Sequence, residues 1–170
     1  IRYKQINFTL SQTRQAVEGQ AKILDARVSA ELAVNNAAKQ GLQIKLQNAK
    51  TDAERLFYTQ KIAAIDVANA KLQLNLAIAQ EAASLKEIQL RIQEAKVSQA
   101  KAAADLASAR ARGIATEQYE KALEAQTELV KQTIAEYNIA KAIAPLKQKN
   151  AQATYDAAVA QAQANVEAER

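Results

Sequence analysis

This sequence of 170 residues contains no cysteine, histidine, methionine or tryptophan, and only three glycines and one proline. Without cysteine, the chain has no disulfide framework. Without cysteine and histidine, zinc sites, haem ligation and catalysis by thiolate or imidazole are excluded. Aromatic residues make up only 4% of the chain, although a compact core needs bulky side chains to fill it. We therefore expect no enzyme, no cofactor, no metal site and no compact globule.

What the chain has in quantity is alanine (40 residues) and glutamine (20 residues), together with lysine, glutamate, leucine and arginine. This is the composition of long helices and coiled coils. Alanine buries little area per residue, so such helices pack closely along narrow seams. The composition predicts an all-α fold in which long helices form an elongated coiled coil or helical bundle. Because methionine is absent and the chain starts at Ile1, we also expect a fragment of a larger chain.

The charges are numerous but interspersed. The net charge is +5, from 23 basic and 18 acidic residues, and no basic stripe of the kind found in nucleic-acid-binding proteins is visible. We therefore expect no specific nucleic-acid partner. Uncharged runs do not exceed about ten residues, well below the roughly 20 that a membrane-spanning helix needs. The sequence also predicts no membrane span.

The centre of the chain carries the strongest periodic pattern. Apolar residues recur in alternating steps of three and four from Phe57 to Ala109, which is a heptad seam. Polar residues interrupt it at Gln60, Lys71, Glu81 and Gln99. The charged residues Lys71 and Glu81 either set register or oligomer state, or the seam drifts around the helix there and leaves them in water. The packing residues that we expect to carry the structural role are Val67, Leu74, Ile78, Leu85, Ile88, Ile92 and Leu106.

A second apolar stripe follows a neighbouring face of the same segment. It consists of Ile62, Ile65, Leu72, Leu76, Ala79 and Ala83. Two stripes on one helix indicate more than one neighbour, whereas a two-stranded coiled coil needs a single stripe. We therefore expect a homo-oligomer with at least three helices in cross-section, and a trimer in particular.

Glycine, proline and capping patterns divide the chain. They predict an N-terminal helix over 1–41, a central helix over 42–112, a helix link at 113–116 and a C-terminal helix over 117–170 that is kinked near Pro145. Within the link, Gly113 fits a left-handed cap, Ile114 its apolar contact and Thr116 the next N-cap. Thr51 and Glu54 have the spacing of a capping box, so a helix either starts there or runs through from Leu42.

Residues 66–126 resemble the tape measure protein of long-tailed bacteriophages. The resemblance lies in Ala-Gln-Leu-Lys helices broken by a rare Gly-Ile-x-Thr link: "DVANAKLQLNLAIAQEAASLKEIQLRIQEAKVSQAKAAADLASARARGIATEQYEKALEAQ". It implies a structural segment in the virion that fills the lumen of the tail tube, sets tail length, contacts tube and tip proteins, and is released before genome ejection. A fully helical chain of this size would span about 255 Å, since each residue adds 1.5 Å.

A second resemblance is to the α-hairpin of periplasmic adaptor proteins from efflux and type I secretion systems. "ARARGIATEQYEKAL" is similar to the turn of such hairpins, and "AVAQAQANVEAER" to their returning helix. This resemblance implies a periplasmic protein that docks on a channel through its hairpin tip. The adaptor tip pattern places Arg, Leu and Ser at positions that are Asp105, Ala109 and Thr116 here. A third interpretation of the sequence is a generic coiled-coil scaffold.

Overall fold

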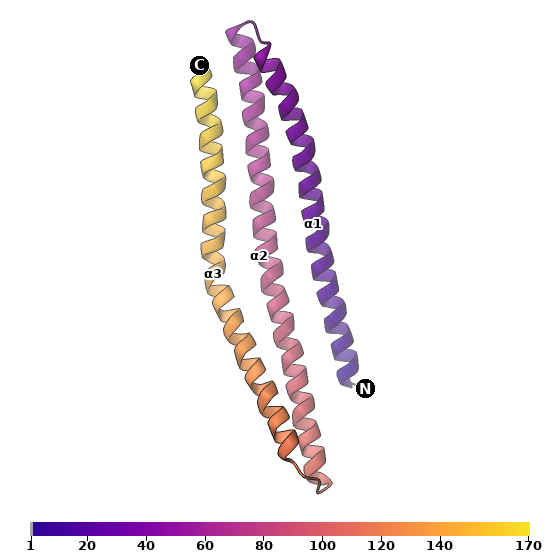
Figure 1. The fold of residues 1–170 in the computed structure, drawn as a ribbon. Helices are drawn as coiled ribbons and strands as arrows, with labels where there is room; N and C mark the ends of the chain where they lie inside the picture. The colour runs from indigo at the N-terminus through magenta and orange to yellow at the C-terminus, as the bar shows by residue number, and fades with distance from the viewer. Residues whose placement is uncertain (1) are drawn as a thin grey trace. The chain divides into compact units, whose positions relative to one another are not determined.

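The structure is a computed structural model that describes residues 2–170. It contains three helices, α1 (Arg2–Gln47), α2 (Asp52–Ala111) and α3 (Glu117–Glu169) (Figure 1). Helix accounts for 94% of the chain, the described residues include no strand, and the three long helices are packed together. The prediction of an all-α fold is therefore confirmed.

The chain divides into two compact units, each of which contains a segment of every helix. Unit 1 comprises Ile1–Gln20 and Glu81–Ala144, and unit 2 comprises Ala21–Gln80 and Pro145–Arg170. In both units, the contacts described below join α2 to α1 on one side and α2 to α3 on the other. α2 is thus the central helix of each unit.

In unit 1, α1 packs on α2 through a small apolar cluster. Leu10 and Val17 of α1 meet Leu90 of α2, and Ile6, Ala83 and Val97 lie against them. On the other side of α2, the amide of Gln99 donates a hydrogen bond of 3.1 Å to the hydroxyl of Thr127 on α3. Residues 112–116 reverse the chain between α2 and α3, so these two helices are antiparallel.

In unit 2, polar pairs join α1 to α2. The Asn35 amide donates to the Asn69 side-chain oxygen at 2.8 Å, and the Lys39 ammonium lies 2.7 Å from the Asp66 carboxylate. The Lys71 ammonium lies 5.3 Å from the centre of the Tyr155 ring on α3, a distance at which cations are attracted to aromatic faces. Residues 48–51 reverse the chain between α1 and α2.

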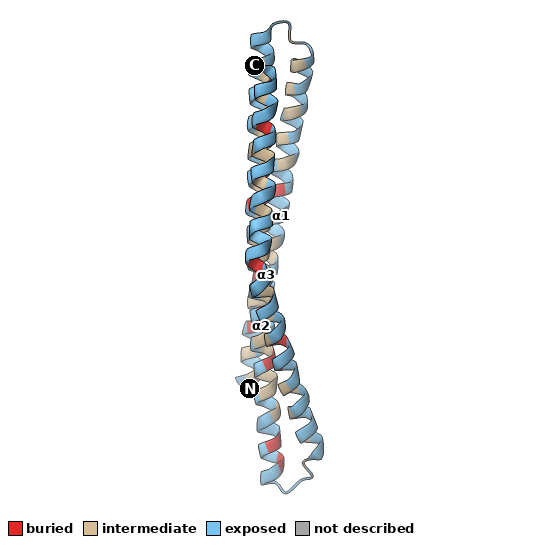
Figure 2. Ribbon diagram, turned by 90° about the vertical axis from the view of Figure 1, so that its left-hand side faces the viewer, coloured by how far each residue is buried: buried red, intermediate tan, exposed pale blue. Residues whose placement is uncertain are grey.

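The core of each unit is thin. No described side chain is less than 2% exposed, and the buried residues are isolated positions along mostly exposed helices (Figure 2). Several of the buried positions are alanines, which let helix backbones approach closely. They are Ala70, Ala95, Ala109, Ala144 and Ala162. Seams in which alanines alternate with single larger apolar residues, rather than a filled apolar centre, therefore hold these helices together.

The two stripes predicted on the central helix face two neighbours in the same chain. Ala83 packs with the α1 cluster, whereas Leu74 shares a groove with Tyr155 and Ala158 of α3. All six residues of the second stripe are half-buried. One chain thus supplies both neighbours, so two stripes do not by themselves require further copies. The trimer stays a prediction.

The seam drifts around α2 at Lys71, which is exposed, whereas Glu81, the other charged residue in the seam, is half-buried. Gln60 and Lys71 are exposed, whereas the preceding residues, Thr59 and Ala70, are buried. A straight α-helix has 3.6 residues per turn and a heptad repeat has 3.5, so a strict heptad falls out of step with a helix that does not supercoil. The strict heptad fits from Glu81 onward, whereas before it the buried position shifts to the preceding residue at Thr59 and Ala70 but not at Leu74.

The boundary predicted at Gly41 is wrong. α1 continues through Gly41 to Gln47, and among the glycines only Gly113 has a positive φ. A glycine inside a helix costs about 1 kcal/mol relative to alanine. Continuing the helix brings Leu42 and Leu46 into half-buried positions, and burial of large apolar side chains offsets a cost of that size.

The start of α2 has the N-cap hydrogen bond of a capping box, and the returning bond of its glutamate goes to the residue before the N-cap. The Glu54 N–H donates to Thr51 Oγ1 at 3.1 Å, and the Glu54 carboxylate accepts from the N–H of Lys50 at 3.1 Å. These contacts satisfy backbone donors that an isolated helix start leaves free. Of the two readings left open by the sequence, the structure has a new helix starting at Asp52, and the central helix does not begin at 42.

The link between α2 and α3 is a glycine cap followed by a new helix start. Gly113 has φ 68°, its N–H donates to Arg110 O at 3.2 Å, and the Ile114 N–H donates to Ala109 O at 3.0 Å. This bond pair is a Schellman motif. Ile114 is exposed, and the hydroxyl of Thr116 donates to the Glu120 carboxylate at 3.1 Å. Residues 112–116 thus form the tight connection.

Replacing Gly113 with alanine should lower the free energy of unfolding by about 1 kcal/mol, because the left-handed conformation is unfavourable for a residue with a Cβ. Gly19 is the matched control, since it lies inside α1 and an added Cβ would meet no atom within 4 Å. Gly19→Ala should raise the free energy of unfolding by about 0.5–1 kcal/mol. Urea unfolding followed by circular dichroism measures both changes. Two shifts of the same sign would contradict the prediction.

Pro145 lies inside α3, and the helix has no break there. The boundary between the two units falls between Ala144 and Pro145. Proline removes one backbone donor from the helix interior and is a common cause of kinks. The kink predicted at this position stays a prediction.

Candidate functional site

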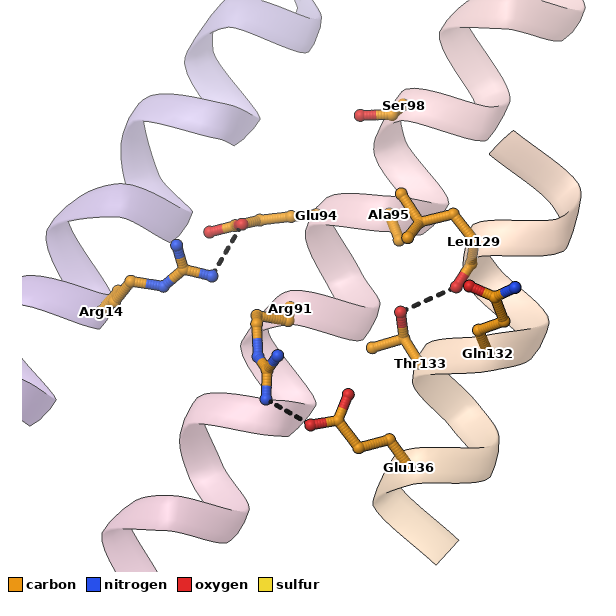
Figure 3. Close-up of a pocket in the computed structure, with 9 residues that line it drawn as sticks. All are labelled: Arg14, Arg91, Glu94, Ala95, Ser98, Leu129, Gln132, Thr133 and Glu136. Atoms are coloured by element: carbon orange, nitrogen blue, oxygen red, sulfur yellow. Dashed lines mark hydrogen bonds and ion pairs between the residues drawn. The ribbon is translucent and has the colours of Figure 1, made fainter. Parts of the chain in front are cut away.

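The candidate site is a polar groove of about 410 Å³ in unit 1, to which all three helices contribute. α1 supplies Arg14, whereas α2 and α3 supply the remaining residues (Figure 3). The groove is lined by Arg14, Arg91, Glu94, Ala95, Ser98, Leu129, Gln132, Thr133 and Glu136. Its polar residues were not singled out by the sequence patterns.

Two ion pairs cross the groove. The guanidinium of Arg14 on α1 lies 2.8 Å from the Glu94 carboxylate on α2. The guanidinium of Arg91 on α2 lies 2.9 Å from the Glu136 carboxylate on α3. In Figure 3, each arginine points toward its own glutamate. α2 thus contributes one cation and one anion, and each outer helix contributes the complementary charge.

The Arg14–Glu94 pair is about a third exposed and the Arg91–Glu136 pair about half exposed. Exposed ion pairs typically add less than about 1 kcal/mol to stability. Charges that match in only one alignment do, however, disfavour alternative alignments of the helices. The groove is therefore suited to fixing the register of α1 and α3 on α2.

Apart from the two ion pairs that align the helices, the groove holds few reactive groups. Among residues 2–170, no three His, Cys, Asp or Glu side chains are grouped so that they could hold a metal ion. The hydroxyl of Thr133 donates to the backbone oxygen of Leu129 at 2.7 Å, which occupies its proton. The sequence prediction of a non-enzymatic protein stays a prediction.

The packing residues predicted on the central helix lie along α2. Leu74, Ile88 and Leu106 are buried. Val67, Leu85 and Ile92 are half-buried. Ile78 is 40% exposed, because the seam has drifted away from it at that point. Their predicted role between copies of the chain stays a prediction, since the structure contains one chain.

Two polar groups in the packing seams differ in a way that can be tested. Thr59 and Thr133 are both buried. The hydroxyl of Thr59 has no hydrogen-bond partner within residues 2–170, whereas that of Thr133 donates to Leu129 O. A buried polar group without a partner costs about 1–3 kcal/mol. The cost at Thr59 is therefore not offset as it is at Thr133.

Replacing Thr59 with valine should raise the free energy of unfolding by up to about 1 kcal/mol, because the isosteric side chain removes an unpaired hydroxyl. The matched change Thr133→Val should lower it by a similar amount, since it removes a hydrogen bond of ordinary net value. Thermal unfolding by circular dichroism measures both. Equal effects of the two substitutions would show that the Thr59 hydroxyl finds a partner in solution.

α2 is also long and apolar enough, by length and composition, to cross a membrane. The sequence predicted no such helix, because charges interrupt its apolar runs. A helix that packs on neighbours along two faces needs apolar residues around much of its circumference. α2 packs between α1 and α3, but only 17% of its most apolar window is buried. The absence of a membrane span stays a prediction.

Comparison with known proteins identifies no relative. No protein family model matches the chain, and neither a curated protein nor a solved structure matches it.

Proposed function

We propose that this chain is a structural segment of a phage tape measure protein. The observation that carries the proposal is the packing of long helices through alanine seams, with buried alanines in both units. Small side chains at helix contacts keep the cross-section narrow, which suits a protein confined to the lumen of a tail tube. The Ala-Gln-rich style of residues 66–126 supports the same reading.

The path of the chain changes the expected ruler length. A single extended helix would give about 255 Å for 170 residues. Within each unit, however, segments of all three helices run side by side, so the rises of 1.5 Å per residue do not add end to end along the whole chain. Folded back in this way, the segment accounts for a tail length close to that of its longest helix, α2, whose 60 residues span about 90 Å. The tail length that the segment contributes is then set by stiff helices of defined length. Its value distinguishes a folded-back segment from an extended one.

The proposed partners are further copies of the chain, in a trimer by preference, and the proteins of the tail tube and tail tip. Large apolar side chains that are exposed on the outer helices support the need for such partners. They include Phe8, Ile23, Val34, Ile44, Ile139 and Leu146. Exposed apolar residues mark an interaction site where they form a contiguous patch. The proposed location is the virion, from which the segment leaves before genome ejection.

Deletion of the segment from the gene of the parent phage tests the proposal. The tail, measured by electron microscopy, should shorten by about 90 Å, the length of α2, if the segment is folded back and by about 255 Å if it is extended. Detection of the intact protein in purified virions by mass spectrometry is the companion measurement. An unchanged tail length, or a protein absent from virions, would overturn the tape measure function.

The α2–α3 hairpin of unit 1 favours one alternative, the hairpin of a periplasmic adaptor. Its helices are antiparallel and joined by a tight turn, which is the architecture of such hairpins. At the three tip positions, however, Asp105 is exposed, Ala109 is 2% exposed and Thr116 is half-buried. Ala109 therefore packs within the hairpin and is not presented to a channel. Recovery of the intact protein from the periplasm of cells without phage would favour the adaptor.

A further inference from the structure

An apolar groove of about 480 Å³ lies between α1 and α2 in unit 2. Two lysines line it, Lys45 of α1 and Lys61 of α2, and the rest of the lining is apolar. The apolar residues are Ala38, Gly41, Leu42, Ala64 and Ile65. A cavity of this size, with mostly apolar walls and a few polar groups, is typical of a small-molecule site.

The two lysines lie at the same end of the groove. Lys39 of α1 pairs with Asp66 of α2, and the two helices are antiparallel. Six residues beyond Lys39 on α1 are therefore level with six residues before Asp66 on α2. This places Lys45 and Lys61 within about 3 Å of the same level along the helices. The apolar lining lies on one side of that level, toward the Lys39–Asp66 pair.

Neither lysine has an anionic partner among residues 2–170. The Lys61 ammonium lies 4.8 Å from the centre of the Phe57 ring, a cation–π contact that leaves its three N–H donors without an acceptor. Asp66 is already paired with Lys39 at 2.7 Å. The lining itself contains no acidic residue. One end of the groove therefore carries two positive charges that nothing in the groove balances.

A ligand that matches this arrangement has one anionic group and one apolar chain. Two like charges at the same level repel each other, and a carboxylate between them would accept a charge-assisted hydrogen bond from each. The apolar surface also continues past the groove, because Val34 lies one turn before Ala38 on the same face of α1 and is 68% exposed. An unbranched chain can follow this surface away from the lysines.

We propose that this groove binds a free fatty acid, with its carboxylate between Lys45 and Lys61 and its hydrocarbon chain along the apolar lining toward Val34. Gly41 gives the chain access to the backbone of α1, since an added Cβ there would meet no atom within 4 Å. The groove belongs to unit 2 and does not depend on the tape measure function. Either proposal can fail while the other stands.

Isothermal titration calorimetry of the full chain with dodecanoate, kept below the concentration at which it forms micelles, tests the inference. We expect saturable binding of one dodecanoate per chain. The double variant Lys45→Gln, Lys61→Gln should weaken binding about tenfold or more, because it removes both charged donors. The matched control is Lys86→Gln with Lys101→Gln, which removes two exposed lysines of α2 outside the groove. It should leave the affinity unchanged.

A second variant blocks the apolar part of the site without threatening the fold. Gly41 lies inside α1, and leucine is a better helix former than glycine. The side chain of Gly41→Leu occupies the groove, so binding should weaken about tenfold or more. Decanoate should bind at least about threefold more weakly than dodecanoate, because it buries two fewer methylene groups.

Three results would overturn the inference. One is the absence of saturable binding, or equal binding of dodecyltrimethylammonium, a cation that the two lysines cannot hold. Another is an affinity that neither the lysine pair nor Gly41→Leu changes, which would place the fatty acid elsewhere on the protein. The third is a chain that does not bind dodecanoate and forms oligomers by light scattering that Gly41→Leu dissociates. A second copy of the chain, and not a fatty acid, would then cover the groove.

Discussion

Replacing Leu90 with alanine is expected to lower the free energy of unfolding by about 2–3 kcal/mol. Leu90 is 6% exposed and is the α2 member of the cluster formed with Leu10 and Val17. Truncation removes three carbon positions from a contact that joins α1 to α2. The expected loss is at the lower end of the range for buried leucines, because a thin core lets neighbouring side chains and water reach the space left behind.

Leu129→Ala is the matched control for this prediction, since Leu129 is also in unit 1 but is 46% exposed. Its truncation should cost about 1 kcal/mol or less, in proportion to the smaller area that it buries. Urea unfolding followed by circular dichroism compares the two variants. If the units unfold separately, only the transition of unit 1 should move. Equal losses for the two leucines would show that the cluster around Leu90 does not hold α1 on α2.

The fold class followed from composition and periodicity because both act locally. Forty alanines and three glycines leave the backbone few alternatives to helix. The turn at Gly113 was equally readable, since basic residues, a glycine and an apolar residue stand in the order of a helix cap. Gly41 has similar neighbours and yet lies inside α1. The difference is tertiary: Leu42 and Leu46 beyond it pack toward α2, and local patterns do not contain that information.

The partners of each stripe were not predictable from the stripes themselves. A helix with two apolar faces requires two neighbours, but the pattern does not say whether they belong to the same chain or to other copies. Two short reversals, at 48–51 and 112–116, supply both neighbours from one chain. The first of these contains the capping box at Thr51, so the signal was present. The sequence alone did not decide between this helix start and a helix that runs straight through from Leu42.

The polar groove was missed for a related reason. Arg14 and Glu94 are 80 residues apart in the chain, and the sequence holds 23 basic and 18 acidic residues that could pair in many ways. Which pairs form depends on the register between helices, and a slip of one turn exchanges every partner. Seam residues are constrained by their own helix and can be found by periodicity. Ion pairs between helices are known only once the register is known.

Introducing leucine in place of Ala109 tests the alanine seams that underlie the proposed function. Ala109 is 2% exposed and lies on the α2 seam one turn before the glycine cap. Three added carbons have no space at a close helix contact, so α3 must move away or side chains must leave their preferred rotamers. The expected loss in the free energy of unfolding is about 1–3 kcal/mol.

Ala107→Leu on the exposed side of the same helix is the matched control, because it makes the same change in helix propensity without entering the seam. It should alter the free energy of unfolding by less than about 0.5 kcal/mol. Comparison of the two variants by thermal unfolding isolates the steric term. If Ala109→Leu instead matched the control or stabilised the chain, the seam would have room for a larger residue. Narrow packing would then be lost as the physical basis for a segment that fits a tube lumen.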